Sequence, residues 1–139
     1  MKKILAILAA AMLGLSACNQ QRTAADEIAD ASAAMDDADY NRAGAICRQV
    51  LQDYQMSDIS ASDLCGMAVI LIKSSEHADS EDNAAAAVKC YHYVTEHKAD
   101  SAAACWGQLP SEDFQYVFLL NNLDTSLSAA ADHTNIPEE

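Results

Sequence analysis

Cysteine is the residue type with the most chemistry in this chain, and it occurs five times in 139 residues. Cys18 stands apart because it follows a segment without acidic residues, which holds Lys2, Lys3, an apolar run at 4–15 and two small residues. A basic start, a short apolar run and small residues before a cut site are typical of a secretory signal. The apolar run is shorter than the roughly 20 residues of a membrane-spanning helix. We therefore expect residues 1–17 to be a removable signal peptide.

The residues at the expected cut site, Leu15, Ser16, Ala17 and Cys18, resemble the lipobox of bacterial lipoproteins. The resemblance implies that Cys18 receives a diacylglyceryl thioether, that the chain is cut before it, and that the new α-amine is acylated. Two or three acyl chains hold a protein on a membrane almost permanently. Asn19 stands where inner-membrane lipoproteins carry Asp, and this difference favours the outer membrane. No run of acidic residues follows Asn19, which favours the periplasmic side over the cell surface. The alternative is an ordinary secretory signal with a cysteine near its cut site.

The remaining four cysteines form an even set, which in an exported chain predicts two disulfides with three possible pairings. They are Cys47, Cys65, Cys90 and Cys105. Antiparallel helices bring together residues that are equidistant from their turn. The midpoint rule favours Cys47 with Cys65 and Cys90 with Cys105, one bridge in each of two hairpins. The midpoint between Cys65 and Cys90 also falls in an expected turn. The pairing of Cys65 with Cys90 and of Cys47 with Cys105 therefore stays open.

Other chemistry for these thiols is poorly supported. The gaps between the four cysteines are far longer than the two to four residues of a zinc knuckle. A thiol and imidazole pair is possible in principle at Cys90 and His92, but a spacing of two places them on different helix faces. The chain also lacks phosphate-binding glycine loops, and its carboxylates are spread along the sequence. We therefore expect no catalytic residues, no metal site and no cofactor.

Charge restricts the kinds of partner. The formal net charge is −13, and the chain after residue 17 keeps all 21 acidic residues but only six of the eight basic ones, which gives −15. Nucleic acid is excluded as a partner, because phosphate-binding surfaces are basic. A negative field of this size steers basic partners and makes their binding depend on salt.

Composition indicates helices. Apolar residues make up 51% of the chain and aromatic residues 6%, with 4 Gly and 2 Pro. We expect an all-α fold of about five helices arranged as antiparallel, disulfide-stapled hairpins. The expected helical segments lie at about 24–37, 39–54, 64–72, 81–97 and after Ser111, with a short stretch at 101–106.

Two of these segments need comment. The second has apolar residues at helical spacing through Cys47 and Val50, whereas the third is apolar throughout. A buried strand at 69–72 is the alternative to a central helix buried on several sides. In the last segment, the spacing predicts that Phe114, Val117, Phe118 and Leu119 pack back on the body.

The expected division of the chain follows from these segments. Residues 1–17 are the signal peptide, 18–23 a lipidated tether, 24–127 the helical domain and 128–139 a flexible tail.

A second resemblance concerns the hairpin of the first two helices. Asp39-Tyr40-Asn41-Arg42-Ala43 and the amphipathic helix that follows resemble the inter-helix turn and second helix of a tetratricopeptide repeat, over about 15 residues. That family has glycine where this chain has Ala38. The resemblance implies helical hairpins.

The function that these features favour is that of a small membrane-anchored envelope lipoprotein, which acts as a non-enzymatic protein-interaction module. The candidate partner contacts are Tyr93 and His92, since Tyr91 lies on the apolar stripe of its helix. The alternatives are an acidic inhibitor or sequestering protein for a basic periplasmic partner, and an enzyme whose site carries no recognised motif.

Overall fold

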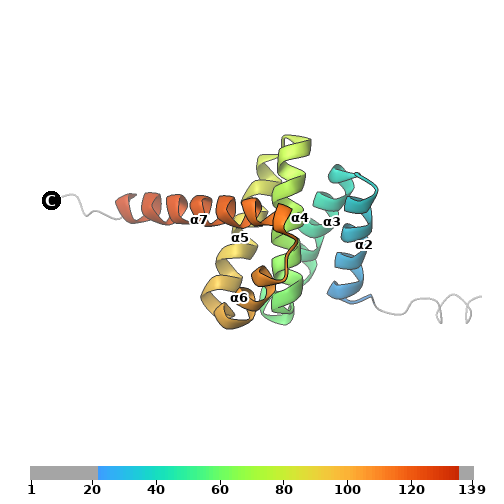
Figure 1. Ribbon diagram of the computed structural model, residues 1–139, viewed down its shortest axis with the longest axis horizontal. Coiled ribbons are helices and arrows are strands. Elements are labelled where there is room, and N and C mark those ends of the chain that lie inside the picture. The colour runs from blue at the N-terminus through green and yellow to red at the C-terminus, as the bar shows by residue number, and fades with distance from the viewer. Residues whose placement is uncertain (1–21, 135–139) are drawn as a thin grey trace, which may run out of the picture.

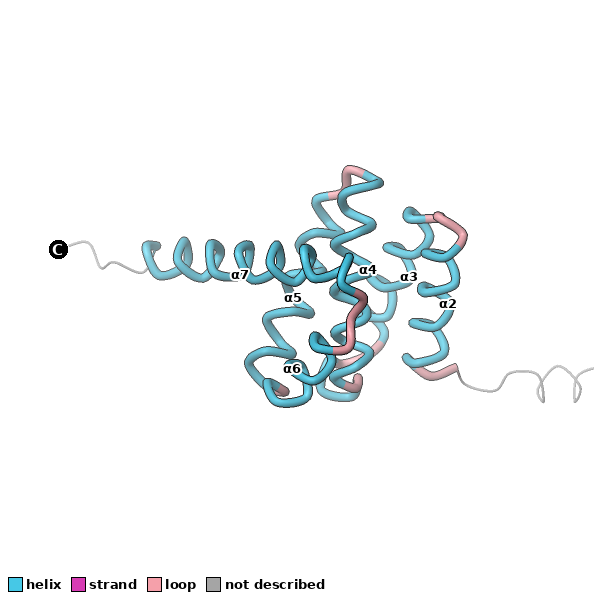
Figure 2. The backbone as a smooth tube through the Cα atoms, viewed as in Figure 1, coloured by secondary structure: helices cyan, strands magenta, loops and turns pink. Residues whose placement is uncertain are grey.

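The computed structural model describes residues 22–134, and in this range every regular element is a helix (Figures 1 and 2). Adjacent helices pack largely as antiparallel pairs. The elements are α2 (Ala24–Asp36), α3 (Tyr40–Asp53), the 3₁₀ turn η1 (Met56–Asp58), α4 (Ala61–Ala78), α5 (Glu81–His97), α6 (Ala99–Gly107), the 3₁₀ turn η2 (Ser111–Asp113) and α7 (Phe114–Thr134). The all-α prediction is confirmed, with six α-helices in the described part because the short stretch near 101–106 forms α6. The lipobox residues Leu15, Ser16, Ala17 and Cys18 lie outside the described residues.

Side-chain caps define where the helices begin. The Thr23 hydroxyl accepts the backbone N–H of Asp26, and the Asp26 carboxylate accepts the backbone N–H of Thr23, which completes a capping box. Ser60 and Ser80 accept backbone N–H groups in the same way at the starts of α4 and α5. These bonds satisfy donors that the first helical turn leaves unpaired.

Helix α4 lies at the centre of the fold and packs against α2, α3, α5, α6 and α7. Nine of its 18 residues are buried, including the unbroken run Met67–Ile72. A helix can be apolar around its whole circumference only when other elements cover every side. The prediction of a central helix is confirmed, and the alternative of a strand at 69–72 is wrong.

The turn between α2 and α3 has an unusual backbone conformation. Ala38 has a φ of 57°, in the left-handed region that glycine adopts without strain. An alanine at this position therefore carries some backbone strain.

Close approach of α3 and α5 depends on Gly44. A Cβ placed on Gly44 meets the side-chain amide of Asn83, which is buried, with its nitrogen at 2.5 Å and its oxygen at 2.8 Å. A Cβ on Gly66 in α4 meets nothing within 4 Å. Gly44 and Gly66 both lie inside a helix, and they differ in whether an added Cβ meets a neighbouring side chain.

We predict that Gly44→Ala destabilises the protein by about 1 kcal/mol, because overpacking outweighs the helix propensity that alanine gains. Gly66→Ala is the matched control and is expected to stabilise by about 0.5–1 kcal/mol. In an Asn83→Ala background the Gly44 substitution should become stabilising too. Urea denaturation of the four variants measures these changes, and equal effects at both glycines would contradict the packing argument.

Helix α7 departs from the expected packing. Val117 is half-buried and Leu120 is fully buried, but Phe114, Phe118 and Leu119 are exposed. The prediction that these three residues pack on the body is therefore wrong. Helix α7 crosses the body and can bury only one of its sides there, and at about 100° per residue these three residues lie at least about 100° around the helix from the buried Leu120. The C-terminal half of α7 extends beyond the other helices (Figure 1). It continues to Thr134, although we expected a tail from residue 128.

Candidate functional site

The four described cysteines are free thiols, and no pair lies at bonding distance. Cys47, Cys65 and Cys90 are buried, whereas Cys105 is partly exposed. Burial raises the pKa of each of the three buried thiols to about 12, and the nearby Cys105 contributes to the shift at Cys65. Cys47 is influenced by Cys90, and Cys65 by Cys105 and Cys90. Cys65 and Cys105 are thus close in space, although the midpoint rule does not favour their pairing.

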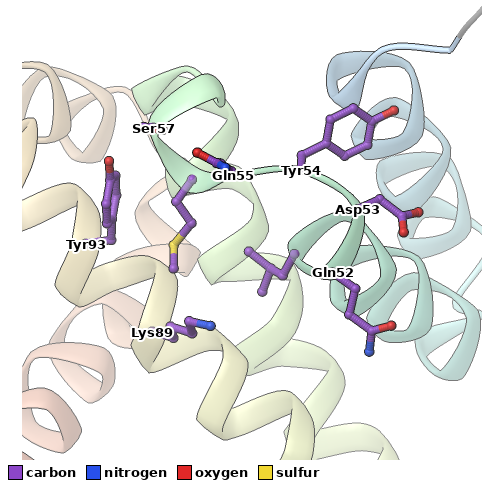
Figure 3. A pocket seen from close by; sticks show the side chains of 9 residues that line it. Gln52, Asp53, Tyr54, Gln55, Ser57, Lys89 and Tyr93 are labelled. Atoms are coloured by element: carbon purple, nitrogen blue, oxygen red, sulfur yellow. The ribbon is translucent and has the colours of Figure 1, made fainter.

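Tyr93 lines a shallow groove of about 620 Å³ between two parts of the chain (Figure 3). One wall is the end of α3 and the connection through η1, residues 51–57, and the other is α5 with Lys89 and Tyr93. The Tyr54 hydroxyl is directed away from the groove and donates to the carbonyl oxygen of Arg22 at 2.8 Å. Tyr93 is therefore placed where a bound segment could touch it.

His92, the second candidate contact, lies on another side of α5. Its Nδ1 is 2.9 Å from the Asp124 carboxylate of α7. The neighbouring Tyr91 donates to the side-chain oxygen of Asn121 at 3.2 Å. Burial, with a smaller contribution from the Asp124 charge, raises the pKa of Tyr91, so this donor stays protonated at neutral pH. His92 and Tyr91 thus attach α7 to α5.

A second attachment holds the N-terminal end of α7 on α4. Lys73 of α4 forms an ion pair with Asp113 at 2.5 Å, and both side chains are largely removed from water, at 25% and 11% exposure. The Lys73 ammonium also lies 5.3 Å from the centre of the Tyr116 ring, whose hydroxyl donates to Glu76 at 3.1 Å. Burial and this hydrogen bond raise the pKa of Tyr116. The base of α7 is thereby fixed in direction.

The fixed helix carries the largest exposed apolar side chains of the described residues. We call these the α7 apolar residues: Phe114, Phe118, Leu119 and Leu127. Phe118 is 71% exposed and Leu127 58% exposed. Phe114 and Phe118 are four residues apart and share one face of α7, and exposed apolar side chains that share a face mark interaction surfaces. We take α7 as the candidate functional site.

Other kinds of site find little support in residues 22–134. No group of three or more His, Cys, Asp or Glu side chains is placed to hold a metal ion in this part of the chain. Among the same residues, no helix combines the length and apolar character needed to cross a membrane. The carboxylate and imidazole groups described above are engaged in holding helices together.

Sequence reasoning missed the α7 apolar residues because they share the spacing of core residues. Phe114 and Phe118 are four apart, as are Leu119 and Leu123, and both patterns suit a helix that packs on a body. The available signal was that apolar residues at 114, 117, 118, 119 and 120 cover more than one face, which one neighbouring surface could not cover.

Comparison with known proteins identifies no relative. The chain matches no protein-family profile, no curated protein and no solved structure.

We predict that Lys73→Ala destabilises the protein by about 2 kcal/mol, because it leaves the Asp113 carboxylate buried without its cation. Arg48→Ala is the matched control, since Arg48 and Asp82 form an exposed pair at 3.9 Å whose loss should cost less than about 0.5 kcal/mol. Denaturant unfolding gives both values, and hydrogen exchange should show earlier opening of α7 in Lys73→Ala. Equal losses in the two variants would contradict an anchoring role for Lys73.

Proposed function

We propose that this protein is a lipoprotein of the cell envelope, anchored through acyl chains on Cys18, whose helical domain acts as a non-enzymatic protein-interaction module. The observation that carries the interaction role is the position of the α7 apolar residues on a helix that extends from the body (Figure 1). The anchor is supported by the lipobox resemblance at Leu15, Ser16, Ala17 and Cys18. The outer membrane, with the domain facing the periplasm, is the proposed location.

The partner we propose is a protein with an apolar groove rimmed by basic residues. Helix-in-groove recognition uses apolar anchors on one projecting helix, as α7 provides. Residues 114–134 contain no Lys or Arg, and their carboxylates are Asp124 and Asp132. A partner that covers α7 therefore buries no cation of this chain, and a basic rim complements the acidic body around it.

Two other occupants of α7 are less well supported. A second copy of the chain would bring two bodies of charge −15 together. If Cys18 anchors the chain, the membrane is nearest the start of α2, whereas α7 ends on the other side of the domain (Figure 2). The five residues from Cys18 to α2 span at most about 20 Å. These arguments favour a protein partner at a distance from the anchor.

The anchor is tested by Cys18→Ala. Without the thiol no thioether can form, so the protein should move from the membrane fraction to the soluble fraction. Cys105→Ala is the matched cysteine control and should stay with the membrane. Unchanged partitioning of Cys18→Ala would show that the proposed anchoring is wrong.

The interaction role is tested by Phe118→Ser in the membrane-anchored protein. Truncation of a central apolar anchor weakens binding by at least about tenfold, whereas stability should change by less than about 0.5 kcal/mol because Phe118 is exposed. Ala45→Ser on the exposed side of α3 is the control. The measurement is recovery of a cross-linked partner from cells that carry each variant, and equal recovery from Phe118→Ser and Ala45→Ser would contradict a docking role for α7.

The acidic surface supports a second candidate, an inhibitor or sequestering protein for a basic partner. Ion pairs within the chain engage Arg22, Arg48 and Lys73, so the excess of exposed charge is negative. Binding of this kind weakens steeply with salt, whereas docking of apolar side chains persists. Binding of a poly-lysine peptide at low and high salt, compared between wild type and Phe118→Ser, separates the two. Tyr93→Ala tests whether the groove beside residues 51–57 contacts the partner in either of the two candidate functions.

A further inference from the structure

Helix α6 is held on the body by little apolar burial of its own. Ala102 is its one buried residue, and Cys105 and Trp106 are partly exposed. The Trp106 ring stacks on Tyr91 with ring centres 5.8 Å apart. A nine-residue helix is marginal in water by itself, so α6 depends on its attachments to the body.

The end of α6 brings a thiol to α4. Cys105 and Cys65 both line a cavity of about 230 Å³, together with Gly66, Gln108 and Leu109. Gly66 has no side chain, and a Cβ placed on it would meet nothing within 4 Å. Cys105 is also among the groups that raise the pKa of Cys65, as a near neighbour would. The two thiols are therefore direct neighbours across the α4 and α6 contact.

From this juxtaposition we propose that Cys65 and Cys105 are a site of disulfide formation, which bonds α6 to α4, while Cys47 and Cys90 remain thiols. Cys105 is the cysteine with solvent access in the described range, so it can meet an oxidant, whereas Cys47 and Cys90 are fully buried in the core. The inference rests on the proposed export in one respect, which is that an exported protein reaches a compartment where an oxidant is present.

The oxidant is a disulfide, such as glutathione disulfide or a protein disulfide. The Cys105 thiolate attacks one sulfur of it, forms a mixed disulfide and releases one thiolate. Cys65 then loses its proton and attacks the Cys105 sulfur, which releases the second thiolate. Two cysteines are oxidised, one disulfide is reduced to two thiols, and the two cysteine protons go to the released thiolates.

The sequence allows an unambiguous assignment of the pairing. Trypsin cuts after Arg and Lys, so the four cysteines fall in four different peptides, 43–48, 49–73, 90–98 and 99–139. The purified full chain is reduced, freed of reductant, incubated in the native state with glutathione disulfide, and then alkylated and digested. We expect peptide 49–73 linked to peptide 99–139, with 43–48 and 90–98 alkylated.

Variants make the test specific. Cys105→Ser should abolish the linked peptide, and Cys90→Ala should retain it. Dithiothreitol should lower the Tm of the oxidised wild type by roughly 10 °C and leave that of Cys105→Ser unchanged, because the bond closes a loop of about 40 residues. Any other linked pair, or full alkylation or separate glutathionylation of 49–73 and 99–139, overturns the inference. The oxidation is carried out on the purified full chain with Cys18→Ala, so its outcome does not depend on whether Cys18 is acylated.

Discussion

The structure depends on one constraint, which is that α4 must be covered on every side. The run Met67–Ile72 has no polar position, so water must be kept from the whole circumference of the helix. Helices α3 and α5 flank it, α2 closes the side of α3, and α6 and α7 close the remainder. Every other α-helix of residues 22–134 thus contacts α4, which explains why the antiparallel hairpins form one body and not an open array.

The cover of α4 requires only part of α7. Leu120 completes the cover of α4 and is fully buried, and the neighbouring turns attach to Lys73 and His92. Residues 125–132 of α7 are all exposed, Leu127 among them. A helix that is anchored at its base and bare beyond it has a defined direction before any partner binds, which limits the entropy that binding must remove. This is the physical basis of the proposed interaction role.

The sequence predicted the parts of the fold in which local signals agree with packing. The α3 stripe through Cys47 and Val50, the capping residue Thr23 and the buried character of α4 were all readable, because each rests on spacing or on caps within one segment. The exposure of Phe118 was not readable, since apolar spacing shows which side chains share a face and not which faces are covered. The neighbourhood of Cys65 and Cys105 was missed for a similar reason, because the midpoint rule assumes hairpins of two helices, whereas α6 folds back on α4. Of the candidate contacts, Tyr93 lies in a groove and His92 is engaged with α7, a distinction that depends on a helix distant in sequence.

The central claim is that α7 docks into a different protein, and site-specific photo-cross-linking in living cells tests it most directly. A photoreactive residue in place of Phe118 should give one discrete adduct with another protein, and Phe114→Ser, on the same face of α7, should weaken it by about tenfold. The same photoreactive residue at Ala45 should give no such adduct. An adduct of two copies of this chain, an adduct with lipid, or an adduct that is equally strong from Ala45 would contradict the claim.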